Sequence, residues 1–176
     1  MKFLCFKGEV FMVEHIKIGK ADIKDMDKIY DLISSINKKK EKIIKYDDFN
    51  FNHSKDSLRE ALSDKNKNEM IFIAMDKENF LGMIDISFNN SDYMFFIDKF
   101  AYIKYMYVNK NKLIDTQEYE YVAKELFETA ISEAKEYGFK YVCGDVLTEE
   151  DELRELFEMN HMKNYKKRLQ KNVSTM

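Results

Sequence analysis

The chain has 176 residues, 45% of them hydrophobic and 35% charged, so it is long enough for one ordinary core and too short for two. Its 29 Lys and Arg against 32 Asp and Glu leave a formal charge of -3, without the basic excess that drives non-specific binding to nucleic acid. Five glycines and no proline argue against collagen-like, low-complexity and linker-rich proteins, and no glycine falls between Met83 and Tyr137.

The first eleven residues have two interpretations. Lys7-Gly8-Glu9 can be encoded as a bacterial ribosome-binding sequence shortly before Met12, which would make residues 1–11 an extension upstream of the true start. In the other interpretation they contribute an extra strand at residues 3–6. Under both interpretations residues 12–176 form a single domain. The intact mass of the native protein distinguishes the two interpretations.

A short strand and a helix are predicted next. His15-Ile16-Lys17-Ile18 alternates in hydrophobicity and predicts a strand that ends at Gly19. Asp22 is placed to cap a helix, whose pattern ends at the lysine run from Lys38. The apolar residues at helical spacing are Ile23, Met26, Ile29, Tyr30, Ile33 and Ile36.

The middle of the chain predicts one more helix and three strands. Ser54 can cap a helix that carries Leu58, Ala61 and Leu62, after a polar stretch at residues 47–53. Residues 70–75 and 81–88 predict a hairpin, and residues 100–108 a further strand. On that strand Tyr102, Tyr105 and Tyr107 are predicted to share one face, as the lining of a pocket or as packing.

The longest regular segment is a helix that Gly138 is placed to stop. Its apolar face consists of Tyr119, Val122, Ala123, Leu126, Phe127, Ala130, Ile131, Ala134 and Tyr137. Residues 139–147 then predict a buried strand. Thr148 with Asp151 predicts a capping box for a last helix that Asn160 stops in a left-handed conformation. Residues 162–173 alternate well enough to close the sheet.

This order of elements predicts an α/β layer arrangement, with helices packed on a mixed sheet. Cys5 and Cys143 are the only cysteines and lack any paired Cys/His spacing, which predicts neither a disulfide framework nor a metal site and fits a reducing cytosol. No apolar run approaches the roughly 20 residues that span a bilayer. We therefore expect a cytoplasmic protein without a membrane or nucleic-acid partner.

Four short stretches resemble the GNAT superfamily of acetyl-CoA-dependent N-acetyltransferases, in the order in which that family has them. They are IKIGKADIKDM at residues 16–26, YMYV at 105–108, EAKEYGFKYV at 133–142 and ELFEMNHM at 155–162. The resemblance extends over nearly the whole chain from His15 onward. It implies a mixed, mostly antiparallel central sheet with helices on both faces, and acetyl-CoA as the donor.

The resemblance also implies where the donor binds. The backbone of Met106, Tyr107 and Val108 matches the strand end that holds the pantetheine arm. A Q/R-x-x-G-x-G/A loop in the family then opens the long helix and binds the pyrophosphate, because free helix N-terminal amides and the helix dipole attract anions. The best register places this motif on Glu118, Tyr121, Ala123 and Leu126. The donor-binding residues predicted here are Glu118, Tyr119, Tyr121 and Ala123.

Several residues depart from the pattern that the resemblance implies. Glu118 and Glu120 bring negative charge where the family has a cation or an amide, and Tyr121 replaces a glycine. Phe157 stands where a tyrosine often protonates the leaving thiolate. Two further family residues also differ: an asparagine matches Glu150 or a neighbour of it, and a glycine matches His161.

No catalytic residue is identified from the sequence. Asp98, Glu118 and Glu120 can activate an amine as general bases, although solvated helix-end charges are the simpler interpretation. His161 is better explained as a surface residue, and His15 and His53 have no evident partner.

The leading hypothesis is an acyl-CoA N-acyltransferase that transfers an acyl group from acetyl-CoA to a small-molecule or peptide amine, through a divergent donor site. The alternative is a catalytically inactive binding or interaction module with the same fold, which has lost coenzyme A. A homodimer is compatible with both hypotheses.

Overall fold

The computed structural model of the protein describes residues 3–6, 9–12, 15–44, 54–63, 68–90 and 99–164. In chain order its elements are β1 (Phe3–Phe6), β2 (Glu9–Met12), β3 (Ile16–Lys20), the short 3-10 helix η1 (Ile23–Asp25), α1 (Met26–Ile44), α2 (Lys55–Ala61), β4 (Glu69–Asp76), β5 (Asn79–Asn90), β6 (Phe100–Val108), the 3-10 helix η2 (Lys110–Lys112), α3 (Thr116–Glu136), β7 (Val142–Gly144) and α4 (Asp151–Met159).

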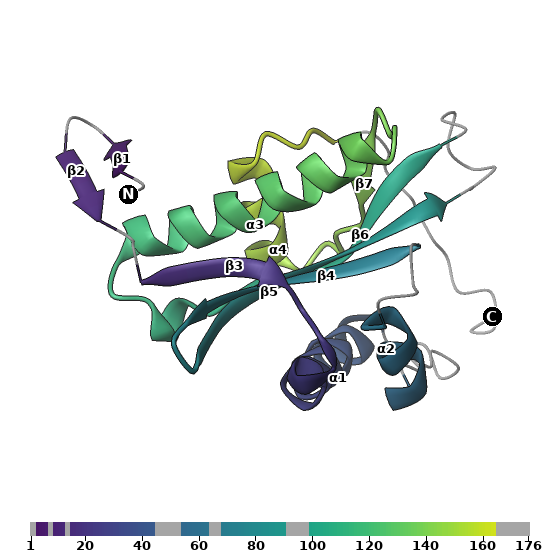
Figure 1. Ribbon diagram of the computed structural model, residues 1–176. Helices are drawn as coiled ribbons and strands as arrows, with labels where there is room; N and C mark the ends of the chain where they lie inside the picture. The colour runs from purple at the N-terminus through teal and green to yellow at the C-terminus, as the bar shows by residue number, and fades with distance from the viewer. Residues whose placement is uncertain are drawn as a thin grey trace, which may run out of the picture.

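The centre of the molecule is a 5-stranded sheet in the order β3-β4-β5-β6-β7. Strands β3 to β6 are antiparallel neighbours, and β7 runs parallel to β6. Helices α1 and α2 cover one face of this sheet, and α3 and α4 cover the other (Figure 1). The predicted fold class, a mixed and mostly antiparallel sheet between helical layers, is therefore confirmed. Strands β1 and β2 form a separate hairpin.

Two apolar cores hold these layers together, one on each face of the sheet. The larger core joins α3 and α4 to the sheet and is centred on fully buried Ile84, Ile86, Val122 and Leu126. The smaller core joins α1 and α2 to the other face through Ile29, Ile33, Leu58, Ile71 and Met83. Burial of these side chains is the main force that fixes the helices on the sheet.

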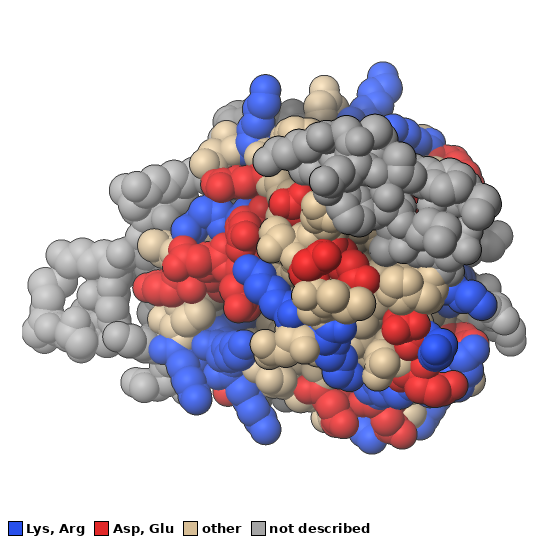
Figure 2. Space-filling model, turned by 90° about the vertical axis from the view of Figure 1, so that its left-hand side faces the viewer, with Lys and Arg blue, Asp and Glu red and all other residues tan. Residues whose placement is uncertain are grey.

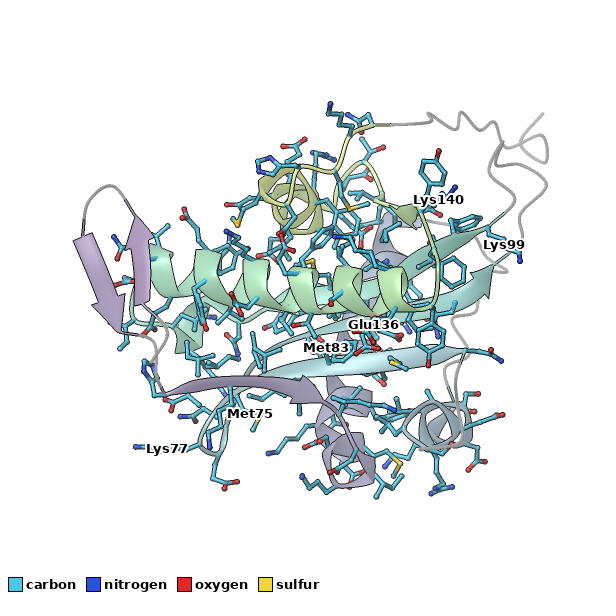
Figure 3. The ribbon with its side chains drawn as sticks, turned by 45° about the horizontal axis from the view of Figure 1, so that its top comes forward. Met75, Lys77, Met83, Lys99, Glu136 and Lys140 are labelled. Carbon is cyan, nitrogen blue, oxygen red and sulfur yellow. The ribbon has the colours of Figure 1, made fainter. Side chains whose placement is uncertain are left out.

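The two ends of the sheet are distinguished by labelled residues in Figure 3. Lys77 lies at the β4–β5 turn and points away from the sheet, at the end opposite Lys99 and Lys140. Strand β6 begins next to Lys99 and ends, at Val108, beside β5. Gly82 allows this approach, because a Cβ there would lie 2.6 Å from the Tyr107 carbonyl oxygen.

Both predicted helix starts in the first half of the chain are confirmed. Asp22 accepts a hydrogen bond from the Lys24 amide, and Asp25 reaches back to the Asp22 amide in a capping box. Ser54 accepts a hydrogen bond from the Ser57 amide at the start of α2. The predicted hairpin and the strand at residues 100–108 are also confirmed, as β4, β5 and β6.

The prediction that the lysine run ends the first helix is wrong, because α1 continues to Ile44. Lysine is a good helix former, so a charged run by itself does not end a helix. In addition, Asn37 is buried and Lys40 forms an ion pair with Glu150, so this part of α1 has tertiary contacts of its own.

The end of the chain also differs from prediction. Only residues 142–144 of the strand predicted at 139–147 form β7, which is a half-buried edge strand. Helix α4 is preceded by Glu150 and has no side-chain cap, so the Thr148–Asp151 capping box is wrong. The left-handed residue is His161, with φ of 60°, and not Asn160. Residues 162–164 form no strand, and 165–173 lie outside the described residues.

Candidate functional site

Strand β6 contains a β-bulge at Lys104. Tyr105 pairs with Asp85 and Ile103 pairs with Ile86, so Lys104 is an extra residue with no partner of its own in this ladder. Residues opposite each other in a ladder share a face, and the bulge therefore places Tyr102 and Tyr105 on the same side of the sheet. The prediction of one tyrosine face is confirmed, although only the bulge makes it so.

The bulge marks the point at which β6 and β7 separate. The two strands pair through Ala101, Tyr102 and Ile103 of β6, and this pairing ends at Gly144. No described strand pairs with residues 104–108 on that side, so a stretch of β6 backbone faces the gap. Gly144 is itself covered by Phe157, because a Cβ on it would lie 2.7 Å from the ring.

A cavity of about 450 Å³ lies along this open stretch of β6. Its walls come from residues 104–108, from the second half of α1, from Lys110 and Tyr119, and from residues 149–153 at the start of α4. Of the predicted site residues, Met106, Tyr107, Val108 and Tyr119 line it. The volume lies in the range of ordinary ligand pockets, roughly 300–1,000 Å³.

A polar cluster lies behind the bulge, on the side of the sheet that α1 covers. The Lys104 ammonium lies 2.6 Å from a Glu69 carboxylate oxygen and 3.8 Å from one of Asp85. Asp85 is completely buried, and neither of its carboxyl oxygens has a hydrogen-bond partner among the described residues. Burial raises the pKa of Asp85 to about 8, against the attraction of Lys104, so the carboxyl is mostly protonated at neutral pH.

Two further polar contacts connect the cavity wall to α1. The Tyr105 hydroxyl donates a hydrogen bond to the buried Asn37 side-chain oxygen, at 3.1 Å. The Lys40 ammonium lies 3.3 Å from a Glu150 carboxylate oxygen, and both side chains are largely buried. Since buried polar groups that are paired specify a fixed geometry, these contacts hold α1 and α4 on either side of the cavity.

The tyrosines around the cavity keep their protons at neutral pH. Burial raises the pKa of Tyr107, and the nearby Glu152 adds to the effect. Burial also raises the pKa of Tyr105 and that of Tyr119. All three are therefore hydrogen-bond donors and not phenolates.

Two carboxylates lie at the N-terminus of α3. Asp115 accepts a hydrogen bond from the Glu118 amide, at 2.9 Å. Glu118 in turn accepts one from the Ile114 amide, at 2.8 Å, and its other oxygen lies 3.3 Å from His15 Nε2. Within the first turn of α3 the Glu118 amide is thus bound to a side chain, and the two carboxylates place negative charge where a helix start otherwise attracts anions.

Tyr121 and Ala123 lie within α3 and not at its start. Both are buried, and both belong to the core between α3 and the sheet. Helix α3 begins at Thr116, so the positions that match the glycine-containing loop of the family are already helical. Ala123 is fully buried, and a binding role for it, as for Glu118 and Tyr121, stays a prediction.

The remaining candidates are spread over the molecule. Phe157 is buried against Gly144 and does not line the cavity. Glu150 lines it, paired with Lys40, while His161 is exposed after α4. Glu120 is half-buried on α3, and Asp98 and His53 lie outside the described residues.

The cluster of Glu69, Asp85 and Lys104 was not predicted from the sequence. A signal for it exists, because Asp85 interrupts a strand that is otherwise apolar from Leu81 to Ile86. A charged residue at a core position of a strand is unusual and indicates a special environment. Lys104 gives no such signal, since a bulge is not visible in the spacing of one strand.

Charge and metal-ligand patterns add no second site. Acidic and basic side chains alternate over the face in Figure 2, without one large basic area among the described residues that it shows. Across the described ranges, His, Cys, Asp and Glu form no group of three that could hold a metal ion. None of the helices described combines the length and apolar character that a membrane crossing requires.

Comparison with solved structures confirms the GNAT acetyltransferase fold. The aminoglycoside acetyltransferase AAC(6')-Iy, solved with a bisubstrate analogue that contains coenzyme A, has a TM-score of 0.65 and 12% identity, over 90% of this chain and 97% of that one. A predicted acetyltransferase from Clostridium acetobutylicum, solved with acetyl-CoA, has a TM-score of 0.58 and 17% identity, over 92% and 98%.

A ribosomal-protein-alanine N-acetyltransferase from Brucella melitensis also has this fold, with a TM-score of 0.58 and 11% identity, over 89% of this chain and 99% of that one. No protein-family model and no curated protein sequence matches the chain. At these identities the likeness establishes the fold and leaves the reaction to be argued from the site.

Proposed function

We propose that the protein is an N-acyltransferase, which holds an acyl thioester along β6 and transfers the acyl group to an amine. This proposal rests mainly on the bulge at Lys104. After the bulge, the β6 backbone separates from β7 and borders a cavity of about 450 Å³. Similar structures hold coenzyme A or acetyl-CoA. We therefore take acetyl-CoA as the first donor to test, and a small-molecule or peptide amine as the acceptor.

The proposed reaction is a direct transfer. The amine nitrogen attacks the thioester carbonyl carbon, and the carbon–sulfur bond breaks. The nitrogen loses one proton and the sulfur gains one, so the products are an amide and a free thiol. Backbone groups of Met106, Tyr107 and Val108 bind the thioester arm and polarise its carbonyl. The cavity holds amine and thioester together, so positioning supplies much of the rate.

Tyr107 and Tyr119 are suited to assist the leaving group. Both line the cavity and both keep their hydroxyl protons at neutral pH. Either hydroxyl can donate a hydrogen bond to the departing sulfur, a role that Phe157 cannot fill. The Glu69–Lys104–Asp85 cluster supports the bulge from behind and takes no part in the proton transfer.

Release of free thiol from acetyl-CoA tests the proposal, with an aminoglycoside and a peptide with N-terminal alanine as acceptors. Ile36→Trp places a large ring in the cavity wall, and we expect it to abolish transfer. Lys28→Trp, on an exposed position of the same helix, is the matched control. Equal rates in both variants, with unchanged thermal midpoints, would contradict a site in this cavity.

A second function is favoured by the N-terminus of α3. Asp115 and Glu118 occupy amides there and add negative charge, as expected of a protein that has lost coenzyme A and serves as a binding module. Calorimetric titration separates the two functions. If neither acetyl-CoA nor S-acetyl-pantetheine binds at millimolar concentration, the transferase proposal fails and the binding module remains.

A further inference from the structure

The cleft along β6 and the adjoining end of α3 are suited to different parts of a thioester donor. The open β6 edge and the cavity can take an extended, mostly apolar arm with a thioester at its tip. A nucleotide diphosphate on the same donor needs amides or cations beside the cavity. The first turn of α3, with Tyr119 in the cavity wall, is the helix N-terminus placed for this.

That helix start carries two negative charges, which oppose the binding of an anion. Two of its carboxylates accept hydrogen bonds from backbone amides, at 2.9 Å to Asp115 and 2.8 Å to Glu118. The Glu118 side chain is 13% exposed and lies against His15, so it is held in place. A diphosphate would have to displace these carboxylates or approach them as a like charge.

Four of the described residues that line the cavity are lysines, and three of them are paired with carboxylates. The fourth, Lys39, is an exposed residue of α1, which forms a different wall from α3. Lys110 lies 2.8 Å from Glu155 and stacks over the Tyr119 ring. Lys104 and Lys40, the other paired lysines of the cavity wall, are engaged with Glu69 and Glu150. Each of these three ammonium groups already has a carboxylate partner, so none of the three is a preformed diphosphate ligand.

We infer that the donor is an acyl thioester on a pantetheine arm without a nucleotide diphosphate bound against α3. Such an arm occurs as a small free thioester or as phosphopantetheine attached to a carrier protein. This inference rests on the proposed function, since it specifies the donor for the same cleft. It is carried by the juxtaposition of an open β6 edge with an α3 start that bears the negative charges of Asp115 and Glu118.

Isothermal titration with acetyl-CoA and with S-acetyl-pantetheine tests the inference. We expect the two dissociation constants to agree within about threefold, because the nucleotide half of acetyl-CoA gains no contacts. Binding of acetyl-CoA tenfold or more tightly than S-acetyl-pantetheine overturns the inference and leaves the proposed function intact. Absence of binding by either thioester overturns both.

A double variant tests the physical cause. Asp115→Asn with Glu118→Gln keeps side-chain oxygens that can accept the two amide hydrogen bonds and removes both negative charges. We expect acetyl-CoA to bind at least threefold more tightly to this variant, with little change for S-acetyl-pantetheine. An unchanged ratio of the two dissociation constants shows that the carboxylates do not exclude the diphosphate, and overturns the inference.

The matched control removes two charges from the other half of the same helix. Glu128→Gln with Glu136→Gln changes two exposed residues. The nearer one, Glu128, lies roughly 20 Å along the helix from Asp115. That distance is well beyond the screening length at physiological salt. We expect this control to bind both thioesters as the unchanged protein does. Tighter acetyl-CoA binding in the control as well would mean a general charge effect and overturn the role of Asp115 and Glu118.

A third titration distinguishes the two sources of the arm. An acetylated phosphopantetheinyl carrier protein that binds tenfold more tightly than S-acetyl-pantetheine supports a carrier-bound donor. Equal or weaker binding of the carrier supports a small free thioester. In both cases the donor lacks a diphosphate against α3, as the inference requires.

Discussion

The open stretch of β6 and the start of α3 border the same cavity, and they differ in whether their backbone groups have partners. Residues 104–108 of β6 leave one edge without a described strand partner, and behind them the buried Asp85 makes no hydrogen bond with a described residue. At α3, by contrast, Asp115 and Glu118 bind the amides of Glu118 and Ile114. Locally unfavourable features persist where function requires them, so β6 carries the stronger sign of a binding site.

The same comparison explains which of the residues that resemble the family indicate a binding site in this protein. The match at residues 105–108 falls on backbone that borders a cavity. The match at Tyr121 and Ala123 falls inside a helix, on side chains that fill the core. Four predictions test this division, from the largest expected effect to the smallest.

Tyr121→Ala is expected to lower the free energy of unfolding by about 3–5 kcal/mol, because it removes a large buried side chain from the α3 core. Urea denaturation measures the change. The exposed neighbour Lys124→Ala is the control and should stay within roughly 0.5 kcal/mol. If Tyr121→Ala also stays in that range, Tyr121 is not a core residue and its role at the binding site must be reconsidered.

Asp85→Asn is expected to change how stability depends on pH. The Asp85 carboxyl has a pKa of about 8 in the folded protein and 3.8 in the unfolded chain. As the pH rises, the unfolded chain therefore releases this proton first. The stability that this group contributes falls between about pH 4 and pH 8. Asparagine does not titrate. The stability of the variant relative to the unchanged protein should therefore rise by roughly 2–4 kcal/mol across this window.

Thermal or urea unfolding at pH 5, 7 and 9 provides this comparison, and the difference between the two proteins cancels the titration of all other groups. Glu78→Gln serves as the control, because Glu78 is an exposed carboxyl in the turn between β4 and β5. A difference that is the same at every pH would show that Asp85 is ionised in the folded protein.

Lys104→Met is expected to cost roughly 1–3 kcal/mol, since it leaves Glu69 largely buried without its cation. A double-mutant cycle with Glu69→Gln measures the coupling, which should account for most of the loss. Coupling close to zero would mean that the cluster behind the bulge does not stabilise it.

Asp115→Ala is expected to lower the free energy of unfolding by about 1 kcal/mol, through the loss of the α3 cap. Asp115→Asn retains an acceptor oxygen and should cost a few tenths of that. Equal losses in both variants would show that charge, rather than the hydrogen bond to Glu118, provides the capping energy.

Much of the fold follows from patterns within single elements. Asp22 and Ser54 as caps, the helical face from Tyr119 to Ala134, and the alternation of β4 and β5 each depend on residues close in sequence. The resemblance then supplied the arrangement of these elements. Predictions failed where tertiary contacts decide the outcome, as at Lys40, whose pairing with Glu150 accompanies the extension of α1 past the lysine run.

The site was less predictable for a similar reason. Residues 106–108 were predicted because strand end and motif coincide, and they line the cavity. The bulge at Lys104 depends on the register between β5 and β6, which neither strand specifies alone. The cap of α3 depends on Asp115, which lies in the connection between β6 and α3, where the family motif gives no register.

The most direct test of a donor site on β6 without a diphosphate site on α3 is a titration with acetyl-CoA, which carries the diphosphate, followed by amide chemical shifts of the labelled protein. We predict that amides of residues 105–108 shift and that those of residues 116–118 do not. Larger shifts at residues 116–118 than at 105–108, or no shift along β6, would contradict this account.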